Sequence, residues 1–341
     1  MIFSKHVRAF LVTLLAHTAF GLSPVSGATI IKLGTLAPEG SGWVNSLRAI
    51  DAEIREVSGG EVGFKIYPGG VQGDEHVMLR KIRIGQIHGG GFGGTGVSRI
   101  LPDVLALEMP FLFDSYEEVD YVLAEMDEFF TAGFAEAGYE FLGWSDIGFV
   151  YLLSQQPIRS STDIQGMDVW RLEDEPITEV LFRLADVTSV PLTIPDVLFG
   201  LQTNLVEVVY ASAAAAIVLQ WFTRVRFYTD LPINYTVGAV LVHNKAFHRI
   251  PNADHRDALR AIARKHINAF NRNNRDDNRE ALKVMRSQAV QPVTPRPEDV
   301  ESFRVLVERA IPELVGSAFS AQAYDSVLRH LDDFRRGNTS P

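Results

Sequence analysis

The sequence has 341 residues, of which 46% are hydrophobic and 22% charged, and its formal net charge at pH 7 is −10. This length predicts two domains, each with enough apolar material for a core. The acidic balance, with no basic cluster interleaved with aromatic residues, excludes nucleic acid and anionic membrane surfaces as partners. The absence of cysteine excludes a disulfide framework and a lipoprotein cysteine.

Residues 1–28 have the pattern of a secretory signal peptide. Lys5 and Arg8 form a basic start, residues 9–22 are apolar, and small residues lead to Ala28. A membrane anchor is the alternative, but the apolar run is shorter than the roughly 20 residues needed to cross a bilayer. We therefore expect cleavage near Ala28 and export of a soluble mature chain.

Strand and helix patterns alternate over the next part of the chain. Apolar residues alternate in segments 29–36 and 62–66, which predicts two strands. Helical spacing in segments 43–57 and 74–84 predicts a helix after each strand. This order indicates an α/β fold in which helices cover a parallel sheet.

The glycine-rich segment 88–96 matches the G-x-G-x-x-G pattern of dinucleotide-binding sites. That fingerprint requires a long helix directly after the glycines, whereas only residues 97–101 precede Pro102. We therefore interpret the glycines as positions where the backbone approaches a ligand closely, or as a plain turn. Phe92 is the candidate ligand contact in this segment.

The middle of the chain is strongly apolar. Segment 105–113 is predicted core, and a capping box of Ser115 and Glu118 begins the following helix. The almost continuous apolar run 141–153, with Trp144 near its start, predicts a buried strand that crosses between two lobes. The alanine-rich run 208–222 is too short to span a bilayer and predicts a buried helix behind the cleft.

Two short predicted strands, 169–172 and 208–210, end in loops that open helices. In an open α/β sheet, ligands lie outside the carboxyl ends of the strands. Here those ends carry Trp170, Arg171 and Tyr210. The sequence therefore predicts a pocket with a large aromatic wall at this edge of the sheet.

The order of short motifs between residues 29 and 245 resembles that of the solute receptors of tripartite ATP-independent periplasmic (TRAP) transporters, of the dicarboxylate-receptor type. Each motif alone is weak, but nine occur in the family's order. They are Ser58-Gly59-Gly60, Tyr67-Pro68-Gly69-Gly70, Gly85-Gln86, Pro110-Phe111-Leu112-Phe113, Gly143-Trp144, Gly148-Phe149, Pro157-Ile158, Asp163-Ile164-Gln165-Gly166 and Leu201-Gln202-Thr203. The resemblance implies a periplasmic binding protein that passes a small organic solute to membrane permease subunits.

The family's fold implies two α/β lobes joined by crossing strands and a long helix, with a ligand cleft between the lobes. The chain would cross near Val150, return near Val237 and cross again along the helix from Asp254. Lobe I would comprise residues 29–149 and 237–272, and lobe II residues 150–236 and 273–341. The segment 271–280 is polar all round, as expected of a bridging segment or of an ordinary exposed helix.

Three positions depart from the family's pattern. Receptors of this type hold the ligand carboxylate with an Arg on the strand after the Asp163–Gly166 motif, and that position is Trp170 here. Arg171 is displaced by one residue, and the alternation of side chains along a strand turns it toward the other face. A second Arg of the family is replaced by Val150, and an Asn by Ala211.

These replacements predict a changed ligand. Burying a carboxylate without a paired cation is costly, and an indole cannot replace a bidentate guanidinium. We therefore expect a solute that is less anionic, or more apolar or aromatic, than C4-dicarboxylates and sialic acids. In the alternative interpretation, Trp170 is core and Arg171 clamps a carboxylate. The candidate ligand contacts are Trp43, Phe92, Trp144, Val150, Trp170, Arg171, Glu173, Tyr210 and Ala211.

Other functions have weaker signals. Glu173 and Asp174 belong either to a solvated loop or to the cleft mouth, where they would pair with a ligand amine or cation. An exported hydrolase would need a nucleophile–base arrangement, which no motif supplies. A sensory receptor that presents a solute to a membrane kinase stays open as an alternative. The histidines lack zinc-helix spacing, so no metal or other cofactor is expected.

Overall fold

The computed structural model describes residues 27–338, so the predicted signal peptide lies outside the described residues except for its last two positions. The helices are α1 (Gly42–Val57), α2 (Glu75–Arg83), α3 (Gly94–Ser98), η1 (Pro102–Glu108), α4 (Tyr116–Glu125), α5 (Asp127–Glu136), α6 (Pro176–Leu184), α7 (Ile194–Gln202), α8 (Ala213–Val218), η2 (Trp221–Arg224), α9 (Asn244–Phe247), α10 (Ala253–Ser287), α11 (Pro297–Leu314) and α12 (Ala321–Asn338). The strands are β1 (Thr29–Thr35), β2 (Val62–Tyr67), β3 (Gly89–Phe92), β4 (Tyr139–Ser154), β5 (Asp168–Arg171), β6 (Thr188–Pro191), β7 (Val208–Ser212), β8 (Phe227–Thr229), β9 (Asn234–His243) and β10 (Gln291–Val293).

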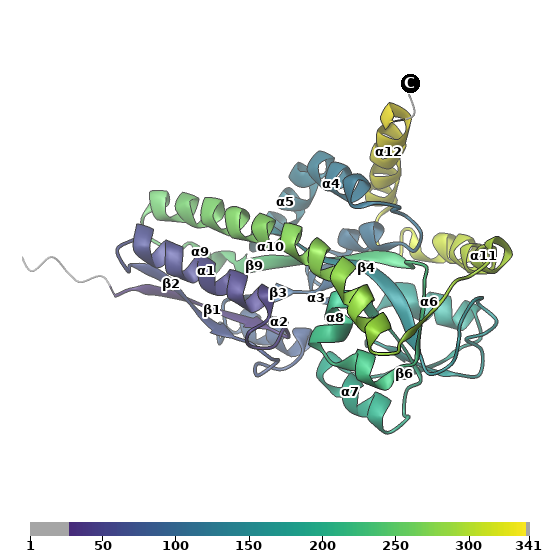
Figure 1. Ribbon diagram of the computed structural model, residues 1–341. Helices are drawn as coiled ribbons and strands as arrows, with labels where there is room; N and C mark the ends of the chain where they lie inside the picture. The colour runs from purple at the N-terminus through teal and green to yellow at the C-terminus, as the bar shows by residue number, and fades with distance from the viewer. Residues whose placement is uncertain (1–26, 339–341) are drawn as a thin grey trace, which may run out of the picture.

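One sheet runs through the molecule in the order β2-β1-β3-β9-β4-β7-β5-β6, with β8 and β10 attached beside β4. Strands β1, β2 and β3 are parallel, and so are β5, β6 and β7. The two parallel groups are separated by the antiparallel pair β4 and β9 (Figure 1). The predicted α/β fold with a helix-covered, largely parallel sheet is thereby confirmed.

The long strand β4 belongs to both halves of the sheet. It pairs with β9 from Tyr139 to Val150, and with β7 from Val150 onward. This crossing matches the buried strand that the apolar run predicted. Because Val150 has a neighbouring strand on each side, it is 5% exposed. The exact boundaries of the two lobes stay a prediction.

Helix α10 is 35 residues long and spans the two halves, from α1 to α8 (Figure 1). Its first part is amphipathic, and Leu259 and Ile262 pack in one core with Leu47 and Ile50 of α1. Its later part places Ala281 and Met285 in the core around Trp170. The helix therefore ties together two cores that lie on opposite sides of the candidate cleft.

The glycine-rich segment forms β3 and the start of α3 rather than a turn. A Cβ on Gly91 would lie 2.6 Å from the Trp43 indole, and one on Gly96 would lie 2.6 Å from a Glu75 oxygen. The plain turn is thus wrong, and the groups that approach these two glycines are side chains of the protein itself. Close approach to a ligand stays a prediction.

No helix within residues 27–338 is both long enough and apolar enough to cross a bilayer.

Candidate functional site

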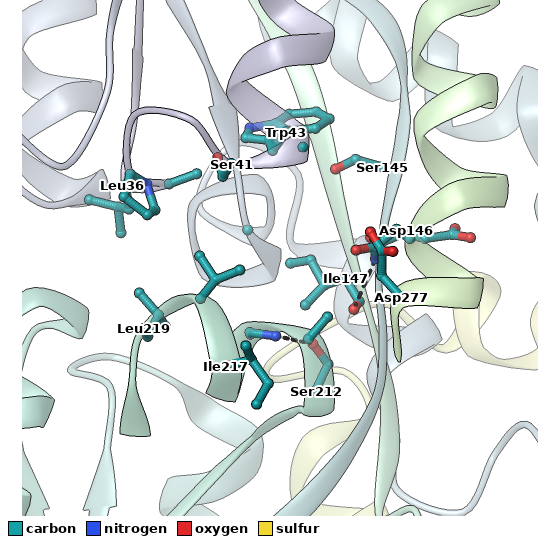
Figure 2. Close-up of a pocket in the computed structure, with 18 of the residues that line it drawn as sticks. Leu36, Ser41, Trp43, Ser145, Asp146, Ile147, Ser212, Ile217, Leu219 and Asp277 are labelled. Atoms are coloured by element: carbon teal, nitrogen blue, oxygen red, sulfur yellow. Dashed lines mark hydrogen bonds between the residues drawn. The ribbon is translucent and has the colours of Figure 1, made fainter. Parts of the chain in front are cut away.

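A cavity of about 480 Å³ lies between the β1–β3 side of the sheet, the α8 segment and helix α10 (Figure 2). Segments far apart in the sequence form its walls. The lining residues are Thr35, Leu36, Ala37, Pro38, Ser41, Gly42, Trp43, Glu75, Gly91, Phe92, Gly93, Ser145, Asp146, Ile147, Ile194, Ser212, Ala214, Ala215, Ile217, Val218, Leu219, Phe270, Asn274, Asp277, Glu280, Ala281 and Val284. Its size falls within the range typical of small-molecule sites.

Aromatic rings form one wall of the cavity. Trp43, in the first turn of α1, packs at 60° against Phe270 of α10, with 5.1 Å between the ring centroids. The side chain of Ser41 accepts a hydrogen bond from the backbone N–H of Val44, which caps α1 and fixes the turn that carries Trp43. Two of the predicted ligand contacts, Trp43 and Phe92, therefore lie on the cavity.

Helix α10 presents a continuous face to the cavity. Its lining residues recur every three or four positions, the spacing of one helix face: Phe270, Asn274, Asp277, Ala281 and Val284. The segment 271–280 was expected to bridge the lobes or to be an ordinary exposed helix. In the structure one side of this segment forms a wall of the cavity, and its cavity-lining residues Asp277 and Glu280 are exposed.

The short helix α8 forms the opposite wall. The Ser212 hydroxyl accepts a hydrogen bond from the backbone N–H of Ala215 and so caps the helix. The backbone N–H of Ala214 donates to the side chain of Asn278 on α10, at 2.9 Å. This helix was expected behind the cleft, but Ile217 and Leu219 place it and its C-terminal end on the cavity itself (Figure 2).

The charges on the cavity wall are all negative. Glu75, Asp146, Asp277 and Glu280 are acidic, and none of the lining residues within the described chain is Lys, Arg or His. A cavity with this lining offers no side-chain cation to a ligand carboxylate. It instead offers apolar contact area, with carboxylates as its only charged groups.

The two buried acids are stabilised in different ways. Asp146 accepts hydrogen bonds from the Tyr235 hydroxyl and from Arg275 Nε, both at 2.5 Å, so its charge has a protein partner. Glu75 accepts a backbone hydrogen bond from Gly93 at 2.6 Å and has no ion pair among the described residues. Burial therefore dominates and raises the pKa of Glu75 to about 7.

A second cavity, of about 110 Å³, adjoins the first and shares Leu36, Glu75 and Ile194 with it. Arg99, just after α3, donates to Asp174 at 2.6 Å across this cavity. The hydrogen bond to Arg99 holds the pKa of Asp174 below its usual value. Glu173 lines this smaller cavity as well.

The structure places Trp170 in the core rather than on the cavity. The residue is 2% exposed, and its ring stacks on Tyr210 at 4.7 Å and meets Trp221 edge-on at 5.1 Å. Its indole N–H donates to the carbonyl of Leu192 at 2.9 Å. Trp170 and Tyr210 were expected to form the wall of the pocket. Instead, their rings pack against each other, and neither residue lines the cavity.

The remaining predicted contacts also lie away from the cavity. Arg171 donates to the Ser189 hydroxyl at 3.1 Å, in agreement with the expectation that it faces the other side of the strand. Trp144 packs among phenylalanine rings, including Phe130 at 5.3 Å. Ala211 is 8% exposed and, like Val150, belongs to the interior of the sheet. Neither cavity is lined by any of these four predicted contacts.

Several lining residues were missed because their signal lies in packing rather than in residue type. Phe270, Asp277 and Ile217 are ordinary residues of helical segments. The regular spacing from Phe270 to Val284 was the one available signal. Among residues 27–338, no group of three or more His, Cys, Asp or Glu side chains is arranged to hold a metal ion.

Known bacterial proteins are similar to this chain. The family model for bacterial extracellular solute-binding protein, family 7, matches residues 33–316. The sialic acid-binding periplasmic protein SiaP of Vibrio cholerae is 21% identical over 306 residues, which cover 86% of this chain and 90% of that protein. The 2,3-diketo-L-gulonate-binding periplasmic protein YiaO of Escherichia coli is 22% identical over 160 residues, covering 45% and 47%.

Solved structures agree with the fold. A TRAP periplasmic solute-binding protein of Citrobacter koseri with bound D-glucuronate has a TM-score of 0.80 at 20% identity, covering 89% of this chain and 99% of that chain. The sugar acid-binding protein of Advenella mimigardefordensis in complex with galactonate has a TM-score of 0.83 at 17% identity, covering 90% and 99%. The chain therefore belongs to family 7 of the bacterial extracellular solute-binding proteins, and it has the fold of the TRAP periplasmic receptors.

Proposed function

We propose that this protein captures a small organic solute in the 480 Å³ cavity and delivers it, unchanged, to the membrane subunits of a TRAP transporter. Export by the predicted signal peptide would place it in the periplasm. Closure around the solute is favoured only as far as the solute contacts both sides of the cleft better in the closed form. The walls from α1, α8 and α10 give a solute such contacts on both sides.

The solute is less anionic, or more apolar or aromatic, than the acids named for the relatives. The observation that carries this proposal is the cavity lining, which has aromatic and aliphatic walls and no Lys, Arg or His among the described residues. A sugar acid would bury its carboxylate beside Glu75 and Asp277 without a paired cation, which costs several kcal/mol. Arg171, the alternative clamp, is engaged by Ser189 and does not line the cavity.

A thermal-shift panel on the mature protein tests this proposal. D-glucuronate and D-galacturonate would be compared with neutral and aromatic solutes of similar size. A ligand at a hundredfold excess over its Kd adds about 2.7 kcal/mol of stability, which is several degrees in Tm. We expect no shift from the sugar acids and a shift from apolar or aromatic solutes. A shift from the sugar acids would contradict the proposed ligand class.

Mass spectrometry of the loaded protein separates binding from catalysis. A solute released by denaturation should have the same mass as the solute added, since the proposal involves no chemical step. A changed mass would indicate an enzyme instead.

A further inference from the structure

Helix α10 carries one charged side chain on the cavity that the protein leaves unpaired. Between residues 275 and 283, Arg275 pairs with Asp120 and Asp146, Asp276 with Arg279, and Glu280 with Lys283. Among the charged side chains in this stretch of the described chain, only Asp277 has neither an ion pair nor a side-chain hydrogen bond. It nevertheless lies on the helix face that lines the cavity.

The wall across the cavity from Asp277 is apolar. Figure 2 shows Asp277 on the α10 side of the cavity, across from Leu36 and Leu219. Phe270 lies seven positions earlier on the same helix face and contacts Trp43. The faces of such rings attract cations, most strongly where water is excluded. The cavity therefore combines two features that favour a positive group, and no Lys, Arg or His is among its lining residues within the described chain.

Because Asp277 has no partner in the protein, a cationic solute should bind more tightly than a neutral one. When the cleft holds a neutral apolar solute, Asp277 loses water and gains no partner, which opposes binding. An anionic solute adds repulsion from Asp277 and Glu75. A protonated amine offsets the desolvation of Asp277 by a charge-assisted hydrogen bond, while its apolar body packs on the aromatic and aliphatic walls.

We propose that the solute is a protonated amine with an apolar or aromatic body, and that Asp277 is the residue that selects its charge. This inference rests on the proposed solute-binding function and specifies the ligand class of the same cavity. Asp146 and Glu280 are not the selecting residues, because each already has a cationic partner within the protein.

Calorimetry with matched solutes tests the inference. The panel consists of triplets that share a skeleton, butyl, cyclohexylmethyl or phenylethyl, and differ only in an amine, a hydroxyl or a carboxylate. The amine of at least one skeleton should bind about tenfold or more tightly than its alcohol, and the carboxylate should not bind. The variant Asp277→Asn should remove most of the amine's advantage and should bind the alcohol at least as tightly as the wild type does.

The neighbouring variant Asp276→Asn is the control. Asp276 has the same chemistry, is similarly exposed and does not line the cavity, so its replacement should leave all three affinities unchanged. Equal binding of amine and alcohol would overturn the inference but leave the proposed function in place. Tighter binding of a carboxylate would overturn both the inference and the proposed ligand class. Failure of every amine to bind would overturn the inference. A thermal melt of each variant confirms that it is folded.

Discussion

Trp170 and Trp43 were both expected from the sequence to contact a ligand, but in the structure they have different surroundings. Trp170 has rings on two sides, Tyr210 and Trp221, and its indole N–H is satisfied by Leu192. Trp43 has one ring partner, Phe270, and lines the cavity. A tryptophan at the carboxyl end of a strand is therefore not by itself a ligand contact, because neighbouring side chains can bury it. We call Trp170, Tyr210 and Trp221 the sealed cluster.

A hydrogen bond helps to hold the sealed cluster together. The Tyr210 hydroxyl donates to the partly buried Glu175, which holds the Tyr210 ring over Trp170. Trp170 and Tyr210 thus fill this part of the interior with protein.

The largest expected effect comes from breaking the sealed cluster. Trp170→Ala should destabilise the protein by about 3–5 kcal/mol, because it leaves a large cavity in a close-packed core. Trp170→Arg should cost at least as much, since it buries a charge without a partner, and it should not create carboxylate binding. Urea denaturation measures both variants. A loss of less than about 1 kcal/mol for Trp170→Ala would mean that this indole is not core.

Removing the other tryptophan should act on binding. Trp43→Ala should weaken solute binding about tenfold to a hundredfold, as truncation of a buried aromatic anchor typically does. Its cost in stability should be smaller than that of Trp170→Ala, because Trp43 is only partly buried. Trp43→Phe, which keeps a ring against Phe270, is the control and should retain most of the affinity. Calorimetry that finds equal affinities for Trp43→Ala and wild type would contradict the assignment.

The acid on the cavity wall predicts a pH dependence of stability. The pKa of Glu75 is raised from 4.5 to about 7 in the folded protein, so the folded state binds more protons than the unfolded state between these values. Its contribution to stability therefore falls as the pH rises from about 4.5 through 7. Glu75→Gln should lie within about 1 kcal/mol of wild type near pH 5 and exceed it by about 3 kcal/mol at pH 8. Urea denaturation of both proteins at both pH values measures this. A stability difference between Glu75→Gln and wild type that is the same at pH 5 and pH 8 would refute the prediction.

The smallest effect is expected at the neighbouring small cavity. Arg99 and Asp174 join the two sides of the cleft, but Asp174 is 72% exposed in its side chain. A double-mutant cycle with Arg99→Ala and Asp174→Ala should give a coupling energy below about 1 kcal/mol for unfolding. A coupling above about 2 kcal/mol would show that this ion pair, rather than the walls of the main cavity, holds the two sides together.

Much of the fold was predictable because it depends on local patterns. The strand–helix alternation, the buried crossing strand and the close approach at the glycines all follow from periodicity and from glycine's missing side chain. The position of the cavity was less predictable. It depends on Tyr210 and Trp221 meeting over Trp170, and on which face of α10 turns inward, and both are set by contacts between distant segments. The spacing of Phe270, Asn274 and Asp277 was the one local signal.

The most direct test is a crystal structure of the protein loaded with the solute found in the panel. We expect the solute to lie against Trp43 and Phe270, with its polar end directed to the inner face of α10. We also expect the stack of Trp170 on Tyr210 to stay intact. A solute stacked on Trp170, or a carboxylate paired with Arg171, would contradict the assignment of the binding site to the cavity beside Trp43 and Phe270.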